Sequence, residues 1–155
     1  MIHLEITDEL RELSQQLLDL YKKNVRDENH SASGNLIRNA SYQLSYNGKC
    51  FELVFFLPEY WKYLEYGTKP HYPPIAPIEE WVKVKRLVPS TDGKIKTTRQ
   101  LAYAIVHKIG INGTNAYNVL GNMMDDNNKE TQAIIDKMVE DIFNQLEKEI
   151  DEEEI

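Results

Sequence analysis

The sequence predicts an α+β fold, in which an N-terminal amphipathic helix packs on a small antiparallel sheet. Three observations lead to this prediction. Leucines recur at helical spacing near the N-terminus, polar and apolar residues alternate on both sides of an Asn-Gly pair, and helical periodicity returns in the second half of the chain. The predicted elements are a hairpin at about 38–57 and, besides the N-terminal helix, helices at about 77–86, 98–109 and 129–150.

The first helix is expected to run from an N-cap at Thr7 to about Arg26. Asp8 and Glu9 then fall in its first turn, where the helix dipole favours negative charge. Its apolar stripe consists of Leu10, Leu13, Leu17, Leu20 and Tyr21.

The hairpin is the clearest local signal. Asn47-Gly48 is the preferred pair for a two-residue type I′ turn, because both positions of that turn need positive φ. The turn predicts the pairs Leu44 with Phe51, Tyr42 with Leu53 and Ala40 with Phe55. In this register the apolar faces of the two strands coincide.

The stretch after Pro58 is rich in aromatic residues and prolines. Gly67 is expected to end a short helix or bend, and residues 70–77 are expected to form a stiff extended arm. Pro77 suits the first position of the helix that follows. The aromatic residues of this stretch are Tyr60, Trp61, Tyr63, Tyr66 and Tyr72.

The later helices have recognisable ends. Thr97 and Gln100 have the spacing of a capping box, and Gly110 is expected to stop the helix that they open. Residues 111–128 are expected to be irregular. The whole of 1–150 is predicted to be one structural domain, followed by a frayed acidic tail at 151–155.

Charge is distributed unevenly along a chain of net charge −7. Residues 83–108, here called the basic segment, carry seven basic residues against Asp92 alone, which gives +6. Residues 125–155 carry three basic and twelve acidic residues, which gives −9. A basic segment on an acidic protein is typical of a nucleic-acid surface, of a surface for an acidic partner, or of a solvated face paired with acidic neighbours. These alternatives stay open.

The sequence shows no recognisable catalytic or metal-binding motif. The histidines His3, His30, His71 and His107 stand in no metal-binding spacing, and the motifs of common hydrolases, nucleotide-binding loops and zinc proteases are missing. Cys50 lies in a predicted strand and reads as a small packed residue. No apolar stretch approaches the roughly 18 residues of a membrane span. We therefore expect that the protein is not an enzyme. We also expect that it binds no cofactor, metal, small-molecule substrate or membrane.

Aromatic residues among prolines and charges favour a protein interface, because aromatic anchors dominate such contacts and a proline arm loses little entropy on docking. The candidate subunit-interface residues are Tyr60, Trp61, Tyr63, Glu65, Tyr66, Gly67, Thr68, Pro70, Tyr72, Pro73, Pro74 and Trp81. The candidate DNA-facing residues are Lys83, Lys85, Arg86, Lys94, Lys96 and Arg99.

Several short motifs, in order, resemble one family. Residues 33–40, SGNLIRNA, look like the TG-x-L-R-x-S motif that leads into the hairpin of tailed-phage neck proteins, also described as head–tail joining, tail-completion or minor tail proteins. Residues 63–68, YLEYGT, resemble that family's Y-x-x-x-x-E-x-G-T signature. The proline run to Pro77, the helix around Trp81 and the segment from Leu101 to Thr114 are also similar, so the resemblance covers residues 1–115.

The sequence departs from the family in three respects. Bulky Trp61 and Tyr63 stand where many members have alanine, and residues 115–155 match no part of the family. The small-residue ending P-F-L-x-P-A is also not clear here.

The resemblance implies a long helix on an antiparallel sheet and a structural virion protein of a tailed phage or prophage. It implies a homo-oligomeric ring at the head–tail junction or tail end, assembled in the bacterial host cytoplasm, with other neck, connector or tail proteins as partners. In such a ring the basic segment would line the DNA channel through non-specific phosphate contacts. The alternative is a small nucleic-acid-binding module that uses residues 83–108, with Trp81 and Tyr103 as stacking groups. A hydrolase or nuclease would need a cluster of carboxylates or histidines that only folding brings together.

Overall fold

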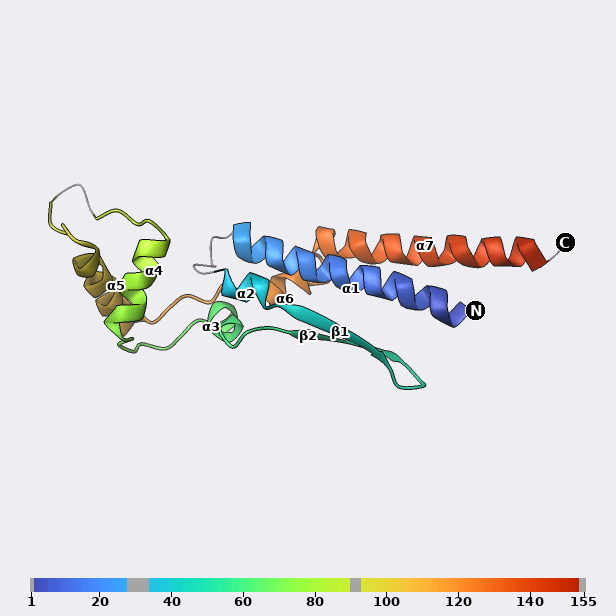
Figure 1. Ribbon diagram of the computed structural model, residues 1–155, viewed down its shortest axis with the longest axis horizontal. Helices are drawn as coiled ribbons and strands as arrows, with labels where there is room; N and C mark the ends of the chain where they lie inside the picture. Colours follow the sequence, from blue (N-terminus) through green and yellow to red (C-terminus); the bar gives the residue numbers. More distant parts are fainter. Residues whose placement is uncertain (1, 28–33, 90–92, 154–155) are drawn as a thin grey trace. The chain divides into compact units, whose positions relative to one another are not determined.

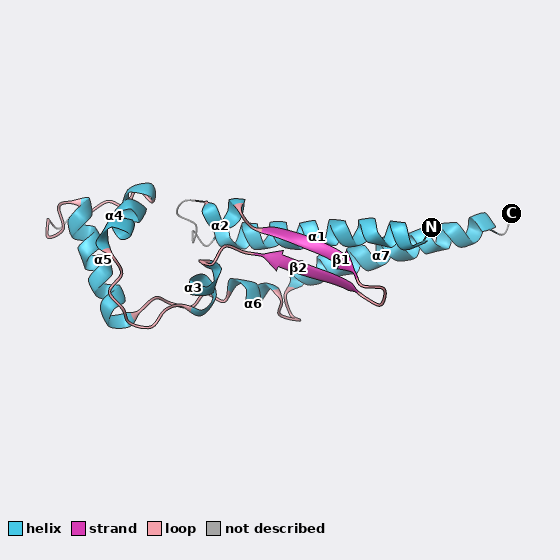
Figure 2. Ribbon diagram, turned by 60° about the horizontal axis from the view of Figure 1, so that its bottom comes forward, coloured by secondary structure: helices cyan, strands magenta, loops and turns pink. Residues whose placement is uncertain are grey.

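The computed structural model describes residues 2–27, 34–89 and 93–153. These residues form an α+β fold of helices and one two-stranded antiparallel sheet, as predicted (Figures 1 and 2). The elements are α1 (Ile2–Asp27), α2 (Asn35–Arg38), β1 (Ser41–Tyr46), β2 (Phe51–Phe56), α3 (Trp61–Tyr66), α4 (Ile75–Val84), α5 (Thr98–Asn112), α6 (Val119–Met123) and α7 (Lys129–Glu153).

The chain divides into two compact units. Unit 1 comprises residues 1–25, 40–57 and 119–155, and unit 2 comprises residues 26–39 and 58–118. The single domain over 1–150 remains a prediction.

Helix α1 supplies most of the core of unit 1. Leu17, Leu18, Leu20, Tyr21 and Val25 are all buried. The helix begins at Ile2, so the predicted N-cap at Thr7 is wrong. The reason is that the helical periodicity continues upstream, with apolar residues at positions 2 and 6 before Leu10.

The hairpin has the predicted faces but another register. Tyr46 pairs with Phe51, Leu44 with Leu53 and Tyr42 with Phe55, so the predicted pairs are wrong by two residues. A shift of two keeps every side chain on its face, and the residues on the paired apolar face are half-buried except Tyr46, which is 46% exposed. The hairpin lies against α1, where the Tyr42 hydroxyl donates to the Arg11 carbonyl at 3.3 Å.

The turn explains the shift. It has four residues, 47–50, and Oδ1 of Asn47 accepts from the amides of Lys49 (3.0 Å) and Cys50 (3.1 Å). Gly48 has φ +86° while Asn47 does not have positive φ, which excludes the predicted type I′ turn. The asparagine side chain therefore closes a wider turn than the dipeptide alone predicts.

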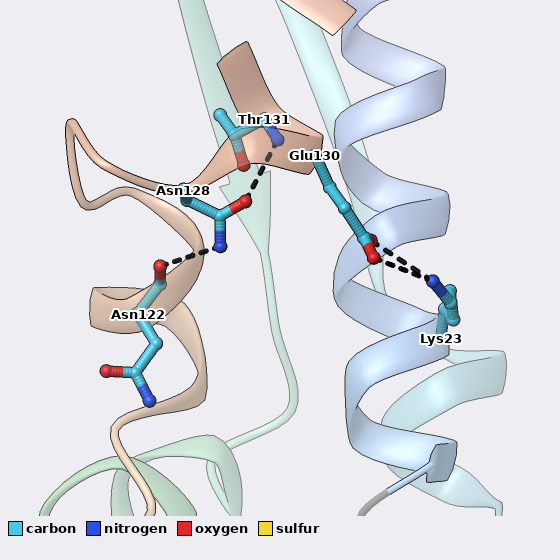
Figure 3. Close-up of polar contacts among 5 residues, drawn as sticks. All are labelled: Lys23, Asn122, Asn128, Glu130 and Thr131. Atoms are coloured by element: carbon cyan, nitrogen blue, oxygen red, sulfur yellow. Dashed lines mark hydrogen bonds and ion pairs between the residues drawn. The ribbon is translucent and has the colours of Figure 1, made fainter. Parts of the chain in front are cut away.

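Helix α7 runs antiparallel to α1. Lys23, late in α1, binds Glu130 at the start of α7 at 3.1 Å, and Gln145, late in α7, donates to Glu9 early in α1 (Figure 3 shows the first contact). Both ends of the Lys23–Glu130 ion pair are more than half exposed, so it contributes at most about 1 kcal/mol.

Helix α7 starts at Lys129, as predicted, and continues to Glu153, three residues past its predicted end. Its cap is Asn128, whose side-chain oxygen accepts from the Thr131 amide at 3.0 Å while its side-chain nitrogen donates to the Asn122 carbonyl at 2.9 Å (Figure 3). Residues 154 and 155 of the predicted tail lie outside the described residues.

Helices α4 and α5 form a helical hairpin in unit 2. Helix α4 occupies 75–84 rather than 77–86, and Pro77 sits in its first turn, where the missing amide is not needed. It ends because Arg86 adopts φ 52°, with the Leu87 amide bonded to the Val82 carbonyl at 3.1 Å.

Helix α5 opens with the predicted capping box of Thr97 and Gln100. It continues to Asn112 and ends at Gly113, so the predicted stop at Gly110 is wrong. Gly113 has φ +71°, whereas Gly110 lies within the helix.

Two of the three short helices, α2 and α6, were not predicted. Helix α2 precedes the hairpin, and α6 lies in the stretch that was expected to be irregular. Helix α3 is the short helix that Gly67 was expected to end. Two further predictions concern segments that lie largely outside the described residues. Residues 27–35, DENHSASGN, have the composition of a loop, and Asp92-Gly93 suits the turn of a small hairpin.

Candidate assembly surface

Two Gly-Thr dipeptides, 46 residues apart, pair with each other in unit 2. The Thr68 amide donates to the Thr114 carbonyl and the Thr114 amide to the Thr68 carbonyl, both at 3.2 Å. The two threonine hydroxyls lie 3.0 Å apart and share a hydrogen bond. We call Gly67, Thr68, Gly113 and Thr114 the Gly-Thr clasp.

Only glycine fits the two glycine positions of the clasp. Gly67 has φ 66° and ψ −169°, and Gly113 has φ 71° and ψ −158°, a region open almost only to glycine. A Cβ on Gly67 would overlap the Thr114 carbonyl oxygen, and one on Gly113 would overlap the Thr68 carbonyl oxygen. The clasp therefore fixes the two crossing chains at backbone contact.

The chain that leaves the clasp then runs along helix α3. The Tyr117 amide donates to the Leu64 carbonyl at 2.9 Å, and the Asn118 amide donates to the Glu65 carbonyl at 3.2 Å. Glu65 and Leu64 are buried, so the predicted interface residue Glu65 lies inside unit 2. Gly67 and Thr68 likewise make their contacts within the unit.

The tyrosines of this region lie on the surface. Tyr60, Tyr63 and Tyr66 are 52%, 56% and 69% exposed. Trp61 is half-buried, and its ring centroid lies 6.0 Å from that of Tyr66. Helix α3 thus buries Glu65 together with Leu64 and exposes its tyrosines, which is unusual because a glutamate is almost never fully buried unless it is paired.

One tyrosine has a perturbed acidity. Partial burial raises the pKa of Tyr60 above its ordinary value, and the nearby Tyr117 phenol acts in the same direction. Since more than half of Tyr60 is exposed overall, its phenol suits an interface contact rather than a proton-transfer step.

The predicted arm is shorter than expected, because α4 begins at Ile75. Pro70 and Pro74 are exposed and Pro73 is half-buried. Tyr72 is 67% exposed, yet one side of its ring rests on Gly110, where a Cβ would overlap the ring atoms.

An apolar groove lies between the arm and helix α5. It encloses about 630 Å³. Its lining residues are Tyr72, Pro73, Pro74, Ile75, Tyr103, Ala104, Val106 and His107. Tyr103 is half exposed, at 50%, so the groove is open to a partner.

Trp81 contributes less surface than expected. It is half-buried in α4, beside Val82, which is fully buried in the packing of α4 and α5 together with Ala102. Trp81 is therefore partly a core residue of the helical hairpin.

The candidate DNA-facing residues are mostly exposed. Lys83 binds Glu79 at 3.1 Å, within one turn of α4, and keeps 61% of its side chain exposed. Lys85 is half-buried, whereas Arg86, Lys94, Lys96 and Arg99 are exposed. All the candidate residues, aromatic and basic, belong to unit 2.

Sequence reasoning missed the clasp, the Tyr72–Gly110 contact and the groove. The repeated Gly-Thr dipeptide was the only local signal for the clasp. The Tyr103 and His107 positions, one helical turn apart, could have indicated an aromatic face on α5.

Over the part of the chain that the structure describes, no group of three or more histidine, cysteine, aspartate or glutamate side chains is placed to hold a metal ion. Among those same residues, every helix is too short or too polar to cross a membrane. Comparisons with family models, with curated proteins and with solved structures found no match to this chain.

Proposed function

We propose that this protein is a non-enzymatic structural subunit of a tailed-phage or prophage particle. In this proposal it belongs to the neck or tail-completion group and assembles into a ring at the head–tail junction or the tail end. The ordered resemblance of residues 33–40 and 63–68 to that group motivates the assignment.

The observation that carries the proposal is the set of exposed tyrosines held next to the clasp. Tyr60, Tyr63 and Tyr66 are each more than half exposed, and the adjoining backbone is fixed by the pairing of Thr68 and Thr114. A rigid, aromatic surface loses little entropy on association and supplies the anchors that dominate protein interfaces. Repetition of one such heterologous contact around a closing rotation produces a ring.

In this proposal the clasp keeps the tyrosine surface rigid. Its backbone hydrogen bonds and close glycine contacts fix the chain beside α3, which reduces the entropy lost on association. The Glu-x-Gly-Thr part of the resemblance coincides with the buried Glu65 and the clasp residues Gly67 and Thr68.

Light scattering coupled to size-exclusion chromatography, followed by electron microscopy of the main peak, tests the proposal. We expect closed rings of uniform diameter. A strict monomer at high concentration, together with a gene that lies outside a cluster of capsid, connector and tail genes, would contradict it.

The second candidate is a nucleic-acid-binding module. The exposure of Arg99 and Lys96 near Tyr103 on the α4–α5 hairpin favours it. It predicts that the free subunit binds short DNA with a steep salt dependence. If the free subunit did not bind DNA at low salt, the nucleic-acid-binding function would be refuted.

A further inference from the structure

Helix α7 exposes a second apolar stripe that its packing on α1 does not use. Val139, Phe143 and Ile150 are 40%, 63% and 62% exposed. Their spacings of four and seven residues place them on one face of the helix. Exposed Glu140 and Glu147 lie one turn to either side of Phe143, so this outer face is apolar with acidic flanks.

The groove of unit 2 has the opposite charge. Arg99 lies one turn before Tyr103 on α5, and Lys108 lies one turn after Ala104. Both side chains are exposed. The groove is therefore apolar with basic flanks.

The flanking charges are arranged differently on the two faces. Glu140 and Glu147 are seven residues apart and follow one edge of the α7 stripe, whereas Arg99 and Lys108 are nine residues apart and lie on opposite sides of α5, so that the groove has a basic residue on either side. The surrounding charges are also opposite in sign, since the basic segment carries +6 and residues 125–155 carry −9.

We propose that the outer face of α7 docks into the groove of a second copy of this chain. This inference rests on the proposed function, and it names one further contact of the assembly, separate from the tyrosines beside the clasp. The contact joins two different surfaces, and each copy carries both the outer face of α7 and the groove. Contacts of this kind generate rings when the rotation closes and helical filaments when it does not.

Charge reversal with mixing tests the docking. One variant carries E140K and E147K on α7, and the other carries R99E and K108E beside the groove. Each alone juxtaposes like charges at every contact, and we expect assembly to weaken at least tenfold by light scattering. A mixture of the two variants restores opposite charges at every contact between unlike copies, and we expect it to assemble as the wild type does.

Matched controls separate docking from folding. A variant with E52K and D126K reverses two exposed acids elsewhere in unit 1 and should assemble normally. F143S should weaken assembly, while F56S, which removes an aromatic residue that is 51% exposed on the hairpin, should not. Circular dichroism and thermal unfolding of each variant should match the wild type.

Different outcomes would refute the docking of α7 into the groove and the ring of the proposed function. Wild-type rings with unaffected charge variants would refute the docking and leave the proposed function standing. A further outcome is that assembly recovers in a chain that carries all four reversals and fails to recover in the mixture. That result would place the contact between α7 and the groove within one chain and refute docking between copies. Rescue in the mixture with open filaments in place of rings would support the docking and contradict the ring. A wild type that stays monomeric would refute the docking, and the gene's neighbourhood would then decide the proposed function.

Discussion

The interior of unit 1 and the interior of unit 2 are stabilised by different kinds of contact. Unit 1 rests on long apolar stripes, with α1 burying Leu17, Leu20 and Val25 against its neighbours. Unit 2 combines a small apolar core, in which α4 and α5 bury Val82 and Ala102, with a few close backbone contacts, above all the clasp between residues 67–68 and 113–114. A periodic stripe tolerates small changes over its length, whereas a backbone contact at glycine tolerates none.

The largest expected effect is at the clasp. Gly67→Ala or Gly113→Ala forces an alanine into a backbone region reserved for glycine and onto a carbonyl oxygen, so we expect a loss of about 3 kcal/mol or more. Hydrogen exchange should show lost protection in α3 and α5 while α1 and α7 keep theirs.

The control for the clasp is Gly48→Ala in the hairpin turn of unit 1. Gly48 also has positive φ, but nothing lies within 4 Å of an added Cβ. We expect only the strain of the left-handed conformation, about 1 kcal/mol. Equal losses for Gly48 and Gly67 would show that the close contact in the clasp is unimportant.

The clasp also shows what the sequence could not predict. Thr68 and Thr114 are 46 residues apart, and no periodicity within either segment indicates their pairing. The stripe of α1 and the alternation of the hairpin are local patterns, and both were predicted correctly. The register of the hairpin was not, because it depends on how the Asn47 side chain bonds the amides of Lys49 and Cys50.

The candidate surface was predictable in composition but not in detail. Sequence reasoning located the tyrosines that turn out to be exposed, yet exposure and burial alternate within a helix as short as α3. It could not separate exposed Tyr66 from its buried neighbour Glu65, because a six-residue helix is too short to establish a stripe.

The next effect concerns the start of α5. Thr97→Ala removes the hydroxyl that accepts from the Gln100 amide at 3.2 Å, and we expect a loss of about 1 kcal/mol in denaturant unfolding. Thr98→Ala, one residue further on, is the matched control and should be nearly neutral. A large loss in the control would mean that the cap is not what stabilises this end of the helix.

A smaller effect tests the Tyr72–Gly110 contact. Gly110→Ala gains helix propensity of about 1 kcal/mol but must displace the Tyr72 ring, so its net effect in the wild type should be close to zero. In a Tyr72→Ala background the same change should stabilise the protein by about 1 kcal/mol. Additive effects in this double-mutant cycle would show that the ring does not rest on Gly110.

The smallest effect is on pH dependence. Because the pKa of Tyr60 is raised in the folded protein, the folded state holds this proton more tightly than the unfolded state. The resulting stability is present below the ordinary tyrosine pKa of about 10 and is lost as pH rises through the raised value. Ultraviolet titration of the wild type against Tyr60→Phe isolates this phenol, and Tyr117→Phe should lower its pKa. A Tyr60 that titrates at or below the ordinary value would contradict the assignment.

We propose that the exposed surface of unit 2 serves assembly. The most direct test of this proposal is the mass of the native wild-type protein, measured by light scattering across a wide concentration range and paired with electron microscopy. We expect a discrete oligomer that appears as a closed ring. A particle of one subunit's mass at every concentration would contradict it.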